Sequence, residues 1–124
     1  MENDLHTVIR ENILEPKDKQ FIMYQIFKTL LFIHSAAIIH RDLKTSHFLI
    51  NNDYYIKVCG LARCTDKDVV MTDFVATRWY RALEILFGST KYGTKADIWS
   101  VGCIFCELLG GKPMFPRNKY FESN

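Results

Sequence analysis

Residues 38–58 read IIHRDLKTSHFLINNDYYIKV, a stretch in which the helical spacing of the preceding residues gives way to short apolar runs. Such runs, rich in Ile, Phe, Tyr and Val, are typical of strands. We predict three small strands, at residues 38–39, 48–50 and 55–58. Asn51-Asn52-Asp53 supplies turn-forming side chains between the last two. The polar sequence at 40–44 would then lie on a loop between strands.

Two helices are predicted before this stretch. The first is short and runs from Leu5 to Asn12. The second begins at Pro16, which fits the first position of a helix, and continues to Ala36. Apolar residues at helical spacing give it one broad core-facing stripe. The stripe comprises Ile22, Ile26, Leu30 and Ile33, widened by Phe27 and Leu31.

A third helix is predicted from about residue 95 to residue 109. Thr94 and Asp97 form an N-cap and N3 pair, and Gly110-Gly111 with Pro113 ends the helix. The residues between leave no polar face, so the helix belongs in the middle of a domain. At ~1.5 Å per residue it is too short to span a membrane. We expect elements beyond Asn124 to cover it, and we expect the isolated chain to associate or to be molten.

Composition narrows the class of protein. The chain has 124 residues, of which 48% are hydrophobic, and these values suit one domain or part of one. Sixteen Lys and Arg against fourteen Asp and Glu are too balanced to favour a nucleic-acid or membrane surface. The N-terminus has no signal-peptide pattern. We therefore expect an intracellular protein, cytoplasmic or nuclear, with a long functional loop at residues 64–77.

Cys103 and Cys106 have the C-x-x-C spacing of a zinc site. Zinc pairs usually lie on a tight turn, however, and these two lie inside an apolar helical run. Free cysteine is also commonly buried as a small hydrophobic residue. The sequence favours reduced thiols over a metal site.

Asp42 and Lys44 carry the strongest chemical signal. A loop carboxylate can accept a hydroxyl proton, and an ammonium two residues later can offset charge on a phosphoryl group in transfer. An ordinary ion pair within a turn is the alternative for this pentapeptide taken alone. Two further segments follow it in order: VATRWYRA at 75–82 with Glu84, and DIWSVG at 97–102.

These segments together resemble protein kinases, and VATRWYRA most resembles mitogen-activated protein kinases. The resemblance covers essentially the whole chain. It implies an α+β, incomplete protein-kinase-like fold, mainly the helical upper part of the C-lobe with short strands around the catalytic loop. Residues 1–124 would form one partial domain from the end of the hinge to just past the central helix. The N-lobe and the later C-lobe helices would be absent.

The resemblance also implies roles for matching residues. Asp42 would be the catalytic base, Lys44 its charge partner, and Thr77 a tie between the loop and both. Asp97 would brace the backbone of the loop. The residues implied for ATP binding are Met1, Asp4, Ser46 and Leu49.

Regulation and substrate choice are assigned in the same way. Arg41 would hold a phosphate on the activation loop, and Thr72 would receive it from an upstream MAP kinase kinase. Arg81 would shape a pocket for Pro after the phosphorylated Ser or Thr, and Glu84 would pair with a later Arg. Protein substrates or signalling partners are implied, with ATP and Mg²⁺ as cofactors.

Several positions depart from the family pattern. Thr45 replaces a Pro, and His47 stands where the family has its metal-binding Asn. Cys59 is followed at once by Gly60, so the Asp and Phe that the family has between them are missing. Phe74 replaces the second acceptor of the T-x-Y motif, and Leu83 replaces the Pro of A-P-E. No glycine-rich loop or nucleotide-binding Lys precedes Met1.

We expect no metal ligand set here and no productive ATP binding, because Mg²⁺ requires oxygen ligands. Three interpretations stay open. The chain is a catalytically inactive, pseudokinase form of a MAP-kinase-type serine/threonine kinase, a partner-binding module, or a segment of an active kinase whose gene model lost the Asp-Phe pair.

Overall fold

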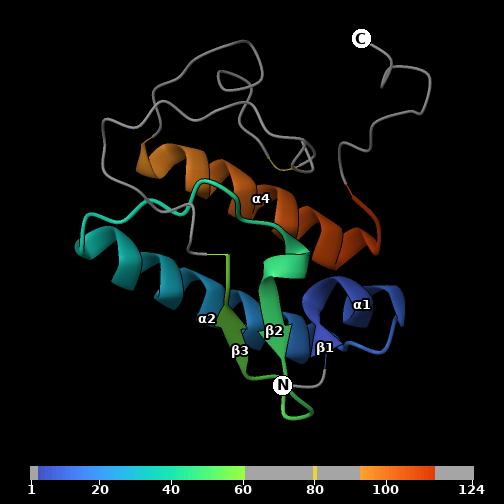
Figure 1. The fold of residues 1–124 in the computed structure, drawn as a ribbon. Coiled ribbons are helices and arrows are strands. Elements are labelled where there is room, and N and C mark those ends of the chain that lie inside the picture. The colour runs from blue at the N-terminus through green and yellow to red at the C-terminus, as the bar shows by residue number, and fades with distance from the viewer. Residues whose placement is uncertain (1–2, 61–79, 81–92, 114–124) are drawn as a thin grey trace, which may run out of the picture.

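The computed structural model describes residues 3–60, 80 and 93–113, and the structural statements below concern these residues. Three helices and a small antiparallel sheet surround one core (Figure 1). The helices are α1 (Leu5–Arg10), α2 (Pro16–Ser35) and α4 (Thr94–Gly110), and a short 3-10 turn, η1, covers Thr45–His47. The strands are β1 (Asn3–Asp4), β2 (Phe48–Ile50) and β3 (Ile56–Val58). This is the incomplete α+β, kinase-like arrangement that the sequence predicts.

The sheet has the order β1-β2-β3, and its register brings Asp4 opposite Leu49. Phe48 and Ile50 of β2 are buried, whereas Leu49 between them points to the other face. The turn after β2 forms as predicted, because the Asn51 side chain accepts the N–H groups of Asp53 at 3.0 Å and Tyr55 at 2.9 Å. β3 begins at Ile56, one residue later than expected.

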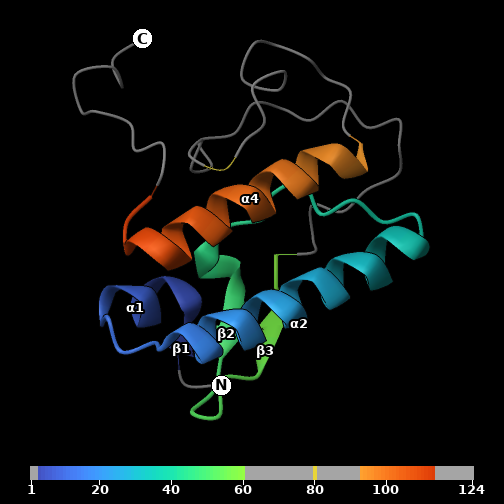
Figure 2. The same ribbon diagram turned by 180° about the vertical axis from the view of Figure 1, so that it is seen from behind.

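α2 and α4 lie side by side, and the sheet crosses one side of α2 (Figures 1 and 2). α2 begins at Pro16 as predicted, and the Asp18 carboxylate accepts the Glu15 N–H at 2.9 Å. Its core-facing stripe is also confirmed; the buried residues are Ile22, Met23, Ile26, Leu30 and Ile33.

The predicted widening of this stripe is wrong. Phe27 and Leu31 are 52% and 72% exposed. Each follows a core residue directly in the chain, and one residue along a helix turns the side chain about 100° away. The apolar sequence of α2 is therefore broader than the face that the described residues cover.

Residues 38–39 do not form a strand, which corrects another prediction. The backbone N–H of Ile38 donates to Ile33 O at 2.9 Å, and that of Ala37 donates to His34 O at 3.0 Å. Ala37 has the left-handed φ of 59°. This bonding pattern caps the C-terminus of α2, so the Ile38 N–H bonds to the helix rather than to a neighbouring strand.

α1 and α4 differ from prediction at their ends. α1 ends at Arg10 rather than Asn12, because Asn12 adopts a left-handed φ of 54°. α4 has Gly93 as its N-cap, and the carboxylate of Asp97 does not cap the helix. Its predicted C-terminus is confirmed, since Gly111 takes a left-handed φ of 78°.

α4 buries three polar residues together with part of its apolar surface. Asp97, Ser100 and Glu107 face inward, while Ile98, Phe105 and Leu109 are exposed. No helix among the described residues is long and apolar enough to cross a membrane. The predicted loop at 64–77 lies outside the described residues.

We predict that the chain self-associates and binds a hydrophobic dye, because neighbouring exposed apolar side chains on α2 favour burial in another molecule. Replacing Leu31→Ser and Phe32→Ser together should lower dye fluorescence and the apparent mass in sedimentation. Leu30→Ser, which changes a buried neighbour, should raise dye binding instead. A monodisperse unmodified chain with no dye binding and a cooperative thermal transition would contradict this prediction.

Candidate active site

The loop of residues 40–44 is fixed by a buried carboxylate on α4. Asp97 is 1% exposed; one carboxylate oxygen accepts the His40 N–H at 2.8 Å, and the other accepts the Arg41 N–H at 3.0 Å. His34 of α2 donates through Nε2 to the first oxygen, also at 2.8 Å. These bonds satisfy a buried charge and hold the loop against both helices.

Arg41 requires this support because its backbone is in the left-handed region, with φ of 75°. A residue with a Cβ carries a penalty there of roughly 1–2 kcal/mol. The charge-assisted hydrogen bonds that Asp97 accepts from the His40 and Arg41 N–H groups offset that penalty, since each contributes about 1.5–3 kcal/mol. The conformation therefore depends on a residue 56 positions further along the chain.

His40 joins the loop to the end of β3. Its Nε2–H donates to Cys59 O at 2.8 Å, and its Nδ1 accepts the Asp42 N–H at 3.1 Å. The two bonds select the neutral ring with its proton on Nε2. Burial lowers the pKa of His40 below its ordinary 6.5, and a protonated His47 nearby would lower it further.

Asp42 lies beside His47, and its side chain is 9% exposed. The Nδ1–H of His47 donates to the backbone O of Asp42 at 2.6 Å, and the same atom lies 3.8 Å from the Asp42 carboxylate. On its other side the ring packs against Gly60, where an added Cβ would lie 2.7 Å from Nδ1. The imidazole therefore fills the space between Asp42 and the Cys59-Gly60 turn.

These residues do not fit Mg²⁺. The ion favours oxygen ligands in octahedral geometry, and the side chain between Asp42 and Gly60 is an imidazole. Within 3–60, 80 and 93–113 no three His, Cys, Asp or Glu side chains gather as a metal site.

Burial raises the pKa of the Cys103 thiol to about 11, so it stays protonated at neutral pH.

The remaining expected site residues are placed as follows. Asp4 and Leu49, both expected near ATP, are cross-strand partners, and the Asp4 carboxylate accepts the Thr7 N–H at 2.8 Å. Lys44 precedes η1, and Ser46 lies within it; both are partly buried. The expected residues Met1, Thr72, Thr77, Arg81 and Glu84 lie outside the described residues.

A second polar cluster next to the loop was not foreseen. Glu107 is fully buried on α4, forms an ion pair with Arg10 at 2.8 Å, and accepts the Tyr80 hydroxyl at 2.8 Å on both oxygens. The Tyr80 hydroxyl also lies 3.1 Å from the Thr45 hydroxyl. A single acid inside the apolar run IFCELL was the signal in the sequence for such a cluster.

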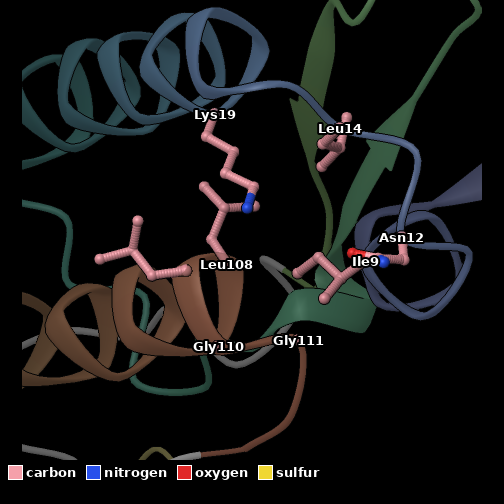
Figure 3. A pocket seen from close by; sticks show the side chains of 8 residues that line it. Ile9, Asn12, Leu14, Lys19, Leu108, Gly110 and Gly111 are labelled. Carbon is pink, nitrogen blue, oxygen red and sulfur yellow. The ribbon is translucent and has the colours of Figure 1, made fainter.

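A small cavity lies between the end of α1, the start of α2 and the C-terminus of α4 (Figure 3). Its walls come from the end of α1, the following loop, Lys19 of α2 and the C-terminus of α4. Asp42, Lys44 and His47 do not line it. The cavity is therefore not part of the site around Asp42.

We predict that acid destabilises the chain through His40. The unfolded chain binds more protons than the folded chain between the lowered folded pKa of His40 and 6.5, so stability rises with pH in this range. The contribution of His40 is complete above about pH 6.5 and is lost as the pH falls toward the folded pKa. The urea midpoint, followed by tryptophan fluorescence, should drop between about pH 7.5 and pH 5.5.

His40→Asn keeps an acceptor for the Asp42 N–H but cannot titrate. It should lower the midpoint at neutral pH and flatten the dependence on pH. His47→Asn, a matched change in the same loop, should retain the drop. An unchanged pH dependence in His40→Asn would show that another group is responsible.

Comparison with known proteins shows the family of this chain. The model of the protein kinase domain matches residues 1–124. The chain is 52% identical over 127 residues to Extracellular signal-regulated kinase 2 of Dictyostelium discoideum, covering 95% of this chain and 34% of that protein. It is 50% identical over 119 residues to Mitogen-activated protein kinase 3 of Arabidopsis thaliana, covering 94% of this chain and 32% of that protein. The chain thus spans about a third of the length of these relatives. It belongs to the protein kinase family and, within that family, resembles the mitogen-activated protein kinases.

Proposed function

We propose that this chain is a non-catalytic member of the MAP-kinase-type serine/threonine kinases, acting in intracellular signalling through protein contacts rather than through phosphoryl transfer. The observation that carries the proposal is the position of His47. Its ring occupies the space between Asp42 and Gly60, donating to one and packing against the other. A kinase requires oxygen ligands for metal ions at its catalytic loop, and this side chain provides none.

The missing Asp-Phe pair supports the same proposal. The Cys59 N–H donates to His47 O at 2.7 Å, and Gly60 follows with a left-handed φ of 82°. The turn therefore closes directly onto the loop without an acidic side chain. Bound metal supplies several kcal/mol of transition-state stabilisation in phosphoryl transfer. Asp42 would remain as a general base without a phosphoryl donor held in place.

The expected result with Mg-ATP and a basic protein substrate is no phosphate incorporation that depends on Asp42. Radiolabelled ATP with the unmodified chain and Asp42→Ala measures this directly. Incorporation that disappears in Asp42→Ala would overturn the proposal. A second measurement tests the role of the metal. Binding of a fluorescent ATP analogue to the unmodified chain should be the same with Mg²⁺ as with EDTA. Replacing His47→Asn and inserting Asp-Phe between Cys59 and Gly60 should make binding depend on Mg²⁺.

A partner-binding role is favoured by one separate observation. α2 exposes several large apolar side chains, among them Tyr24, Phe27, Leu31 and Phe32. Such exposed apolar side chains are typical of a protein-contact surface. The remaining interpretation, a segment of an active kinase, depends on the Asp-Phe pair. Sequencing the transcript across codons 55–65 separates it, because an in-frame Asp-Phe would restore a metal ligand.

Thr72 is the proposed acceptor for an upstream MAP kinase kinase, and Phe74 removes the second acceptor of the dual mark. Treatment with such a kinase, followed by mass spectrometry, should give one phosphate in this loop, on Thr72. Thr72→Val should abolish it, and Phe74→Tyr should add a second site. Phosphate on Thr77 or Tyr80 instead would contradict the proposed alignment of the loop.

A further inference from the structure

A continuous chain of hydrogen bonds runs from α1 through the catalytic loop to α4. His6 Nδ1 lies 3.3 Å from the Thr45 hydroxyl, which lies 3.1 Å from the Tyr80 hydroxyl. Tyr80 donates to both carboxylate oxygens of Glu107 at 2.8 Å. Arg10 of α1 approaches the same carboxylate at 2.8 Å. Thr45, Tyr80 and Glu107 are all buried, so water does not compete at the centre of the chain.

The Glu107 carboxylate sets the direction of these bonds. An ionised carboxylate accepts and never donates, and Glu107 forms an ion pair with Arg10 at 2.8 Å. The hydroxyl proton of Tyr80 therefore points to Glu107. Burial raises the pKa of Tyr80 above its ordinary value, so the hydroxyl retains that proton.

The direction continues back to α1. With its proton directed at Glu107, the Tyr80 oxygen can only accept from the Thr45 hydroxyl. The Thr45 oxygen can then only accept from His6, which requires a proton on His6 Nδ1. The neutral ring of His6 is thereby assigned to the Nδ1–H tautomer.

We infer that Thr45 is a positioning residue, which uses its hydroxyl to hold the segment after Lys44 against Tyr80 and the central helix. In the kinase pattern this position is a proline, which restricts the backbone through its ring and has no side-chain donor. Here the restriction comes from a directed pair of hydrogen bonds. The inference goes beyond the proposed function, because it concerns the conformation of the loop and holds with or without phosphoryl transfer.

The arrangement also joins parts of the chain that are far apart in sequence. Thr45 directly follows Lys44, and Tyr80 is the residue before Arg81, which the kinase resemblance assigns to substrate choice. A side chain at position 45 that cannot bond to Tyr80 would release the loop from that residue. Val has the shape of Thr without its hydroxyl, and Ser has the hydroxyl without the methyl group.

Nitrogen-15 NMR of the histidine rings at about pH 8, where unperturbed imidazoles are neutral, tests the inference directly. In the unmodified chain His6 should show a protonated Nδ1 and an unprotonated Nε2. Thr45→Val should return His6 to the Nε2–H form and shift the amide resonances of Lys44 and Ser46. Thr45→Ser should preserve both signals. A change of packing alone would not move the proton from one ring nitrogen to the other.

A double-mutant cycle of Thr45→Val and Tyr80→Phe provides the second measurement. The two changes should be coupled by roughly two- to twelvefold in the urea unfolding equilibrium constant, as expected for one hydrogen bond. If Thr45→Val does not fold, the Thr45→Ser and Tyr80→Phe spectra of His6 still decide the matter. An Nε2–H tautomer of His6 in the unmodified chain, or additive effects in the cycle, would overturn the inference. Neither result depends on whether the chain transfers phosphate.

Discussion

The described structure depends most on the carboxylate of Asp97. This carboxylate is a negative charge in the interior of the protein. Three donors bond to it, two from the backbone of the loop and one from His34. Without those donors the buried charge would be strongly unfavourable, and without the charge the left-handed backbone of Arg41 would lose its hydrogen bond to Asp97. The loop, α2 and α4 are therefore held in one relation to each other, from which the positions of Asp42 and His40 follow.

α4 buries a second acid, Glu107, in the same way. Asp97, Ser100 and Glu107 recur at spacings of three and seven residues, which places them on one side of α4. Ser100 donates to Tyr80 O at 2.6 Å, and Glu107 receives the hydroxyl of the same residue. Asp97, Ser100 and Glu107 each have a hydrogen-bond partner, so the core tolerates two acids. The inner face of α4 thus fixes loops, while apolar side chains such as Ile98 and Phe105 are left on its outer face.

This division explains how a kinase framework persists around altered chemistry. The interactions that fix His40 and Arg41 involve backbone groups, His34 and Asp97, whereas two positions that depart from the kinase pattern, Thr45 and His47, bond to Tyr80 and to the backbone O of Asp42. His47 takes up the space beside Asp42 by bonding to its carbonyl and packing on Gly60. The loop is therefore held mainly through Asp97, and the proposed non-catalytic role rests on the imidazole of His47 beside Asp42.

Local sequence was sufficient for much of the fold. The spacing of Ile22, Ile26, Leu30 and Ile33, the proline at position 16, and the Asn-rich turn determine α2 and the β2–β3 hairpin, because each is formed by bonds between near neighbours. The motifs around residues 40–44, 75–84 and 97–102 identified the family without any structure. Residues 38–39 were misjudged because an apolar pair does not reveal that the Ile38 N–H closes the end of a helix.

Tertiary structure decided the polar contacts. The residues that meet Asp97 and Glu107 lie between 27 and 97 positions away in the chain, a separation at which periodicity and spacing carry no information. Sequence patterns could show that α4 belongs in a core, yet not which of its faces would be covered. Packing against α2 and the loop selected the face that carries the acids, because only there could their charges find donors.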